Sequence, residues 1–214
     1  MSLPVLYSFR RCPYAMRTRL ALWSAGITCE LREVMLRDKP ISMLNYSPKA
    51  SVPVLVLGPG AVIDESLDAM IWALTQNDPD SWLSPSSARV AQMHALIAIN
   101  DGEFKEHLDR YKYANRYVDV DPLHHRQESE RFIADLNNRL AEHEFLFGNR
   151  PCLADFAIMP FIRQFANTDR AWFDSTDYTR LQTWLTGLLA SQLFASVMMK
   201  YPKWREGDQP TIVP

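Results

Sequence analysis

The sequence predicts an α/β domain followed by an all-helical domain, and three observations lead to this prediction. Over residues 1–76, segments of strand length alternate with segments of helical periodicity. Over 77–87, two clusters of Asn, Asp, Ser and Pro interrupt every pattern. Beyond that point strand-like segments nearly disappear. We therefore expect an α/β domain over 1–76, a linker over 77–87 and an all-helical domain over 88–214.

The first half of the α/β domain has the pattern strand, helix, strand. Residues 5–9 form an apolar run of strand length, and Pro13 then starts a helical pattern that Gly26 ends. Residues 28–34 alternate with period two, as a half-buried strand does. Because a helix connects the two strands, we expect them to pair in parallel through a right-handed crossover.

The second half has the pattern loop, hairpin, helix. Residues 39–47 predict a loop with at most a short helix. Two strand-like runs, 52–57 and 61–63, flank the turn Gly58-Pro59-Gly60 and predict a hairpin. Residues 67–74 then carry an apolar stripe at helical spacing. The predicted order of the whole domain is βαβ–ββα.

The all-helical domain is predicted from four apolar stripes at helical spacing. The stripes lie at 93–108, 132–140, 158–165 and 181–189. Pro160 falls inside the third stripe, where it is expected to kink the helix or to lie in its early turns. The tail after Pro202 is expected to be irregular.

Composition excludes several classes of function. The 214 residues carry a net charge of -2, so no basic field is present to attract nucleic acid. No apolar run approaches the ~20 residues that a membrane span requires, and the N-terminus lacks a signal-peptide pattern. Three cysteines form an odd set without a disulfide framework, which is typical of a reducing compartment. We expect a cytoplasmic protein with no nucleic-acid partner and no membrane partner.

Cys12 is the candidate nucleophile. It lies where the first predicted strand turns into the helix that Pro13 starts. At a helix N-terminus, backbone N–H groups and the positive end of the helix dipole favour a thiolate over a thiol. Arg10, Arg11 and Arg17 add positive charge nearby. The alternative is that Cys12 is a small buried apolar residue, as most cysteines outside disulfides are.

The other chemically active side chains give weaker signals. The five histidines lack partners at metal-ligand spacing, so we expect no metal site. Cys29 lies within a predicted strand and is expected to be a core residue. Tyr7 precedes the Cys12 turn, but its place on a strand favours packing over catalysis.

Several motifs taken together resemble a known family. They are the Cys12-Pro13-Tyr14-Ala15 turn after a strand, the run Val52-Pro53-Val54-Leu55, the helix start Glu65-Ser66 and the helical domain that follows. In this combination and order they resemble the soluble glutathione transferases, most of all the cysteine-type, omega-like members. The resemblance covers essentially the whole chain. It implies a thioredoxin-like first domain, glutathione as co-substrate and a homodimer.

The resemblance also implies a set of glutathione-binding residues. Val52 would precede a cis-proline at Pro53 and offer its backbone N–H and C=O to the cysteinyl part of glutathione. Ser66 and the N–H groups after it would bind the γ-glutamyl carboxylate, and Glu65 the α-amino group. Lys39 would meet the glycyl carboxylate. Without the resemblance, Ser66 is only a helix cap and Lys39 only a solvated charge.

Two expectations concern the helical domain. The segment Pro151-Cys152-Leu153-Ala154-Asp155 resembles the helix-start capping box of the family, with Cys152 in the place of Ser or Thr. Asp155 should still be buried and structural. Aromatic side chains are expected to meet the second substrate, namely Tyr14, Phe104, Tyr111 and Tyr113.

The resulting hypothesis is a glutathione-dependent thiol transferase or reductase, with a disulfide or electrophilic small molecule as second substrate. Ala15 stands where a second cysteine would close a disulfide across the turn, so Cys12 would form a mixed disulfide with glutathione. Dehydroascorbate reduction fits the same scheme. One alternative is a non-enzymatic adaptor of glutathione-transferase-like fold. Another is a membrane-inserting relative of the intracellular chloride channel type, which the short, charged first helix disfavours.

Overall fold

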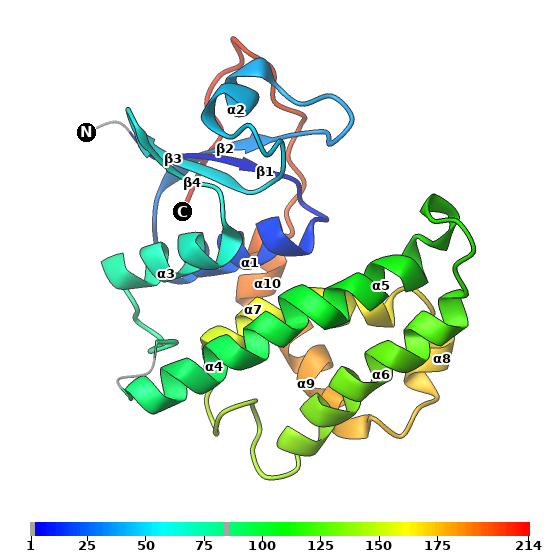
Figure 1. The fold of residues 1–214 in the computed structure, drawn as a ribbon. Coiled ribbons are helices and arrows are strands. Elements are labelled where there is room, and N and C mark those ends of the chain that lie inside the picture. The colour runs from blue at the N-terminus through cyan, green and yellow to red at the C-terminus, as the bar shows by residue number, and fades with distance from the viewer. Residues whose placement is uncertain (1–2, 84–85) are drawn as a thin grey trace. The chain divides into compact units, whose positions relative to one another are not determined.

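The computed structural model describes residues 3–83 and 86–214, which form two compact units. Met1–Asp80 and Ser191–Pro214 make up the first unit, and Ser81–Ala190 make up the second (Figure 1). The change from one unit to the other after Asp80 falls within the predicted linker, 77–87. Ser84 and Pro85 of that linker lie outside the described residues.

The first unit is built on a five-stranded sheet of order β4-β3-β1-β2-β5. β1 pairs in parallel with β2, and the helix α1 connects them, as predicted. β3 runs antiparallel to β1 and forms the predicted hairpin with β4. The strands are β1 (Val5–Ser8), β2 (Cys29–Glu33), β3 (Val54–Gly58), β4 (Ala61–Ile63) and β5 (Ile212–Val213).

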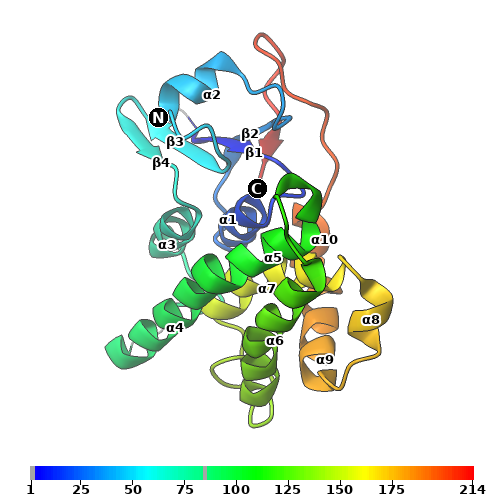
Figure 2. The same cartoon turned by 45° about the vertical axis from the view of Figure 1, so that its right-hand side comes forward.

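Helices cover both faces of this sheet. α1 (Pro13–Ser24) and α3 (Ser66–Gln76) pack against each other on one face, and α2 (Ile41–Tyr46) lies over the other (Figures 1 and 2). α2 is the short helix that the sequence allowed in the loop over 39–47. Gly26 ends the α1 segment with a φ of 66°, a backbone conformation that glycine adopts without steric cost.

The C-terminal tail corrects the predicted domain boundary. The sequence assigned 88–214 entirely to the helical domain, but Ser191–Pro214 belongs to the first unit. In this tail α10 (Gln192–Val197) packs against α1, and β5 pairs with β2 at the edge of the sheet. The Trp204 ring packs edge-on against Tyr7, at a centroid distance of 6.0 Å. A strand of two residues is too short to show a periodicity, so no sequence pattern predicted that the tail returns to the sheet.

The second unit is helical, as predicted. α4, a π-helical turn and α5 follow one another without a break, as Figure 2 shows. The four predicted stripes fall on α4 to α5, α6, α7 and α9, and Pro160 lies in the interior of α7. The helices are α4 (Ser87–Ile99), the π turn (Asn100–Phe104), α5 (Lys105–Lys112), a 3-10 turn (Ala114–Arg116), α6 (Pro122–Arg139), α7 (Leu153–Ala166), α8 (Arg170–Asp174) and α9 (Thr179–Leu189).

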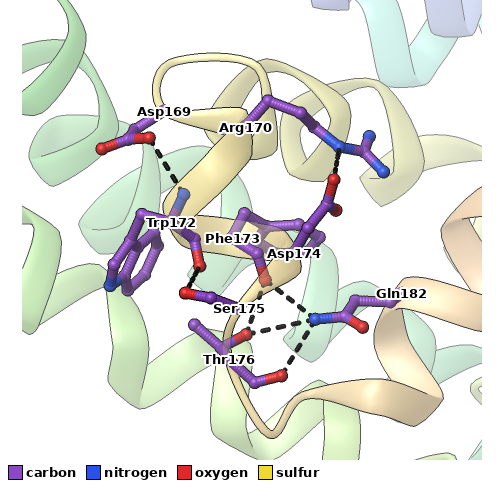
Figure 3. Close-up of polar contacts among 8 residues, drawn as sticks. All are labelled: Asp169, Arg170, Trp172, Phe173, Asp174, Ser175, Thr176 and Gln182. Atoms are coloured by element: carbon purple, nitrogen blue, oxygen red, sulfur yellow. Dashed lines mark hydrogen bonds and ion pairs between the residues drawn. The ribbon is translucent and has the colours of Figure 1, made fainter.

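The short helix α8, which the sequence did not predict, is held by side chains at both ends (Figure 3). Asp169 caps its start, accepting a hydrogen bond from the Trp172 N–H at 3.0 Å. At its other end, the Gln182 amide of α9 donates to the carbonyl oxygens of Phe173 and Thr176 at 2.8 and 3.1 Å. A helix of five residues cannot be stable alone, so these contacts fix its place on α9.

Asp155 is the buried polar centre of the second unit, which confirms the prediction that it is structural. Its carboxylate accepts from the backbone N–H groups of Leu146 and Cys152 at 3.0 and 2.9 Å, and from the Trp184 indole at 2.8 Å. The Cys152 thiol donates to the same carboxylate, at 3.2 Å between sulfur and oxygen. Burial raises the pKa of Asp155 despite these donors.

Replacing this carboxylate should therefore destabilise the protein strongly. We expect Asp155→Ala to lower the free energy of unfolding by about 3 kcal/mol or more, because four donors in the interior of the unit lose their acceptor. The control is Asp174→Ala, which removes an exposed ion pair with Arg170 and should cost less than about 1 kcal/mol. Urea denaturation of both variants measures the difference. Equal losses in the two variants would contradict the structural role of Asp155.

Candidate active site

The turn between β1 and α1 carries Cys12. Cys12 is the N-cap residue of α1, with an extended backbone (φ −74°, ψ 125°), and Pro13 is the first helical residue, as predicted. The side chain is half-buried and packs against the apolar cluster that contains Tyr7 and Ala15. A sulfur in this position lies at the positive end of the helix dipole, which stabilises a thiolate.

Val52 and Pro53 meet Cys12 across this turn. The peptide bond between them is cis, as the sequence resemblance implied, and they lie just before β3. The Cys12 thiol donates a hydrogen bond to the Val52 carbonyl oxygen, at 3.7 Å between sulfur and oxygen. Residues 40 positions apart in the chain thus form one site.

Ser66 is buried and lies at the start of α3, but it is not the cap of that helix. Glu65 occupies the N-cap position, so the interpretation of Ser66 as a helix cap is wrong. The Ser66 hydroxyl instead accepts a hydrogen bond from Nε of Arg17 at 3.0 Å. The Ser66 carbonyl oxygen accepts from the Thr18 hydroxyl at 3.3 Å. Residues of α1 therefore fix the position of Ser66, a link that no sequence pattern indicated.

Glu65 is exposed and belongs to a charged cluster on the surface. Its carboxylate pairs with Lys49 at 2.5 Å, and Lys49 also pairs with Asp64 at 3.0 Å. Asp64 accepts from the Ser47 hydroxyl at 2.7 Å, and this bond, together with Lys49, lowers the pKa of Asp64. Sequence reasoning missed Lys49 and Asp64, because an isolated lysine in a loop carries no signal of its partners.

Lys39 lies between β2 and α2, half-buried and next to Pro40, the N-cap of α2. Its neighbour Asp38 forms an ion pair with Lys203 of the C-terminal tail. The role of Lys39 toward a carboxylate stays a prediction.

The aromatic residues proposed for the second substrate have different surroundings. Tyr14 is half-buried on α1, with the Arg17 guanidinium 5.1 Å from its ring centroid. Phe104 is 1% exposed, and its ring packs 4.9 Å from that of Phe132. Tyr111 is also buried, and burial raises the pKa of its phenol.

Phe104 and Tyr111 are therefore buried in the second unit, and their contact with a second substrate stays a prediction. The apolar stripe that marked them is the side of the helix that faces the core. The Tyr113 hydroxyl accepts from Gln164 at 3.4 Å, and its ring lies 4.0 Å from the Arg116 guanidinium. Tyr14 and Tyr113 stay predictions.

Tyr7, a possible metal site and a possible membrane span were also considered from the sequence. Tyr7 is fully buried, and its hydroxyl accepts from Arg32 at 2.6 Å, in keeping with the packing role expected of it. Within residues 3–83 and 86–214, no group of three or more metal-ligating side chains is present. In the same residues no helix is long and apolar enough to cross a membrane.

The three cysteines should differ sharply in reactivity. Burial raises the pKa of Cys29 to about 12, and burial together with Asp155 raises the pKa of Cys152 further. Both thiols should therefore stay protonated at pH 8. We expect iodoacetamide at pH 8 to label Cys12 in the native protein and to leave Cys29 and Cys152 unlabelled.

Peptide mass spectrometry measures this labelling, and the same reaction in guanidinium chloride is the control, where all three cysteines should react. Native labelling of Cys29 or Cys152 at the rate of Cys12 would contradict this assignment.

The chain is similar to known proteins over parts of both units. Residues 6–82 match the family model described as glutathione S-transferase, N-terminal domain, and residues 105–187 match the glutathione S-transferase C-terminal domain. Glutathione S-transferase omega-1 of Mus musculus is 23% identical over 198 residues, which cover 92% of this chain and 77% of that protein.

Solved structures show the same fold. A glutathione transferase family member from Pseudomonas fluorescens, with two glutathione molecules bound, has a TM-score of 0.80 at 20% identity, covering 92% of each chain. A glutathione transferase from Pseudomonas putida, with one glutathione disulfide bound per subunit, has a TM-score of 0.79 at 18% identity, covering 92% of this chain and 91% of that one. The two domain matches, in order along the chain, show that it belongs to the glutathione S-transferase superfamily.

Proposed function

We propose that this protein is a glutathione-dependent thiol transferase in which Cys12 is the nucleophile. One observation carries the proposal: the Cys12 sulfur lies at the N-terminus of α1, 3.7 Å from the carbonyl oxygen of Val52 beside the cis-proline. In other members of such a family a hydroxyl group can only stabilise the thiolate of glutathione. A thiol in that place can itself form a bond to sulfur.

The first unit offers a group for each part of glutathione. The backbone of Val52, just before β3, can pair with the extended cysteinyl segment as an added strand does. The N-terminus of α3 and the Ser66 hydroxyl suit the γ-glutamyl carboxylate, because a helix start attracts anions. Glu65 would accept from the α-amino group, and Lys39 would pair with the glycyl carboxylate.

The reaction proceeds by two thiol–disulfide exchanges. The Cys12 thiolate attacks the glutathionyl sulfur of a mixed disulfide, the S–S bond breaks, and the substrate leaves as a thiolate that takes a proton from water. A second glutathione thiolate then attacks the Cys12–glutathione disulfide. Glutathione disulfide leaves and the Cys12 thiolate is restored, so each turnover reduces one mixed disulfide to a substrate thiol and joins its glutathionyl group to one reduced glutathione as the disulfide.

The scheme is monothiol because Ala15 replaces a second cysteine in the turn. Disulfides and dehydroascorbate are the second substrates that it suits, and Tyr14 is the aromatic contact that the first unit offers them. We also propose a homodimer and a cytoplasmic location, which are typical of the family.

The test of this function is glutathionylation of Cys12. Incubation with glutathione disulfide should add one glutathionyl group to Cys12, and excess reduced glutathione should remove it. Intact and peptide mass spectra measure both steps, and Cys12→Ser is the control that should gain no adduct. A chain that takes no adduct on Cys12 and is not retained on glutathione–agarose is not this enzyme, and the adaptor hypothesis would then replace it.

The second test concerns the glutathione site rather than the nucleophile. Ser66→Ala should weaken glutathione binding about tenfold, because one charge-assisted hydrogen bond to the γ-glutamyl carboxylate is lost. Ser24→Ala is the matched control in the same unit. The Ser24 hydroxyl donates to exposed Asp80, so binding should be unchanged. Isothermal titration calorimetry compares the two, and equal affinities would exclude Ser66 from the site.

A further inference from the structure

A buried ion pair lies beside the turn that carries Cys12. Arg19 is fully buried on α1, seven residues after Cys12, a spacing that places both on one side of the helix. Its guanidinium Nη1 lies 3.6 Å from Oε2 of Glu33, the last residue of β2. Buried charges cost free energy unless the protein compensates them, so a pair in this position needs a reason.

The pair holds both backbone polar groups of Arg10. The Arg10 N–H donates to Oε1 of Glu33 at 2.6 Å, and the Arg10 carbonyl oxygen accepts from Nη2 of Arg19 at 3.3 Å. Arg10 is two residues before Cys12, inside the turn. The Arg10 side chain in turn donates to the carbonyl oxygen of Met198 in the C-terminal tail, at 3.5 Å. The conformation of the turn therefore depends on these two side chains.

The charge of Arg19 is only partly neutralised by Glu33. Among the described residues, Nε and Nη1 of Arg19 and Oε2 of Glu33 make no hydrogen bond, since the other Glu33 oxygen is used on the Arg10 N–H. Burial lowers the pKa of Arg19 to about 10 against the opposing effect of Glu33, so the guanidinium stays cationic at neutral pH. Burial raises the pKa of Glu33.

The charge on Arg19 responds to several neighbours. Burial has the largest effect on the pKa of Arg19 and lowers it; Glu33 and then Tyr201 raise it, Arg10 lowers it, and a negative Cys12 raises it by the smallest of these effects. The interaction between two charges is mutual, so a cationic Arg19 favours the Cys12 thiolate. An anionic Glu33 opposes this effect.

We propose that Arg19 and Glu33 are positioning residues of opposite electrostatic effect, which fix the Cys12 turn and set the pH at which Cys12 becomes a thiolate. This inference rests on the proposed role of Cys12 as nucleophile. It assigns Arg19 the task of promoting the thiolate and Glu33 the task of limiting it. The groups that take part are Arg10, Cys12, Arg19, Glu33 and Tyr201.

The test is the rate of Cys12 alkylation by iodoacetamide as a function of pH, measured on the Cys12 peptide by mass spectrometry. Glu33→Gln keeps an oxygen that accepts from the Arg10 N–H and removes the negative charge, so the midpoint of the profile should move down by about half a unit to one unit. Arg19→Gln removes the positive charge, so the midpoint should move up by about the same amount. Glu30→Gln, on the same strand but paired with Arg32, is the matched control and should leave the midpoint unchanged.

Opposite shifts are a signature that a purely structural role cannot produce, because two structural losses would disturb the turn in the same sense. Unchanged midpoints, or shifts in the same direction, overturn the inference. If Arg19→Gln does not fold, Glu33→Gln alone tests the inference, and its alkylation midpoint must then move to lower pH. Arg19→Lys, which keeps the charge and shortens the donor, should keep a midpoint near that of the wild type.

The experiment uses no glutathione, so its result is independent of the proposed function. Opposite shifts in a protein whose Cys12 never takes a glutathionyl group would leave the electrostatic inference intact and remove the enzyme. Glutathionylation of Cys12 together with unchanged midpoints would support the enzyme and overturn the electrostatic inference.

Discussion

The parallel pairing of β1 with β2 is the constraint on which the rest of the first unit depends. A parallel pair needs a crossover, and α1 is that crossover, so a helix must begin directly after β1. The same pairing places Ser8 opposite Glu33, which brings the end of β2 level with the start of the turn. β3 runs the other way, so Val52 and Pro53, which precede it, arrive at the same edge of the sheet. Topology alone thus gathers Cys12, the cis-proline Pro53 and the half-buried carboxylate of Glu33.

The helix α1 performs more than one task with its buried side chains. Its two arginines, Arg17 and Arg19, are both buried, one bonded to Ser66 and the other to Arg10. From the sequence, the charges of this helix argued against membrane insertion, and Arg17 was expected to add positive charge near Cys12. Arginine supplies several donors from one rigid group, so a single helix can fix a second helix start and a loop at once. Position in the fold, rather than residue type, decided their roles.

Local patterns in the sequence were enough to predict strands β1 to β4, helices α1 and α3, and the placement of Cys12. These features depend on short-range periodicity and on proline and glycine at element ends, which can be read within a few residues. Side-chain contacts between distant positions could not be predicted from these patterns. Examples are the ion pair of Lys49 with Glu65, the hydrogen bond of Arg17 with Ser66 and the ring contact of Phe104 with Phe132. The helical stripe that contains Phe104 was recognised, but a stripe does not say whether it faces the core or a ligand. Such assignments need the tertiary contacts.

The return of Ser191–Pro214 to the sheet has a consequence for the order in which the two units can fold during synthesis. The first unit completes its sheet only when β5 joins β2, and its core only when Trp204 reaches Tyr7. Both follow the second unit in the chain, so the ribosome adds them after it. The second unit is one continuous stretch of chain, Ser81–Ala190, and all of it is synthesised earlier. Since domains fold as units during synthesis, the helical unit can reach its native state first, while the unit that begins before it cannot be completed until Ser191–Pro214 has been synthesised.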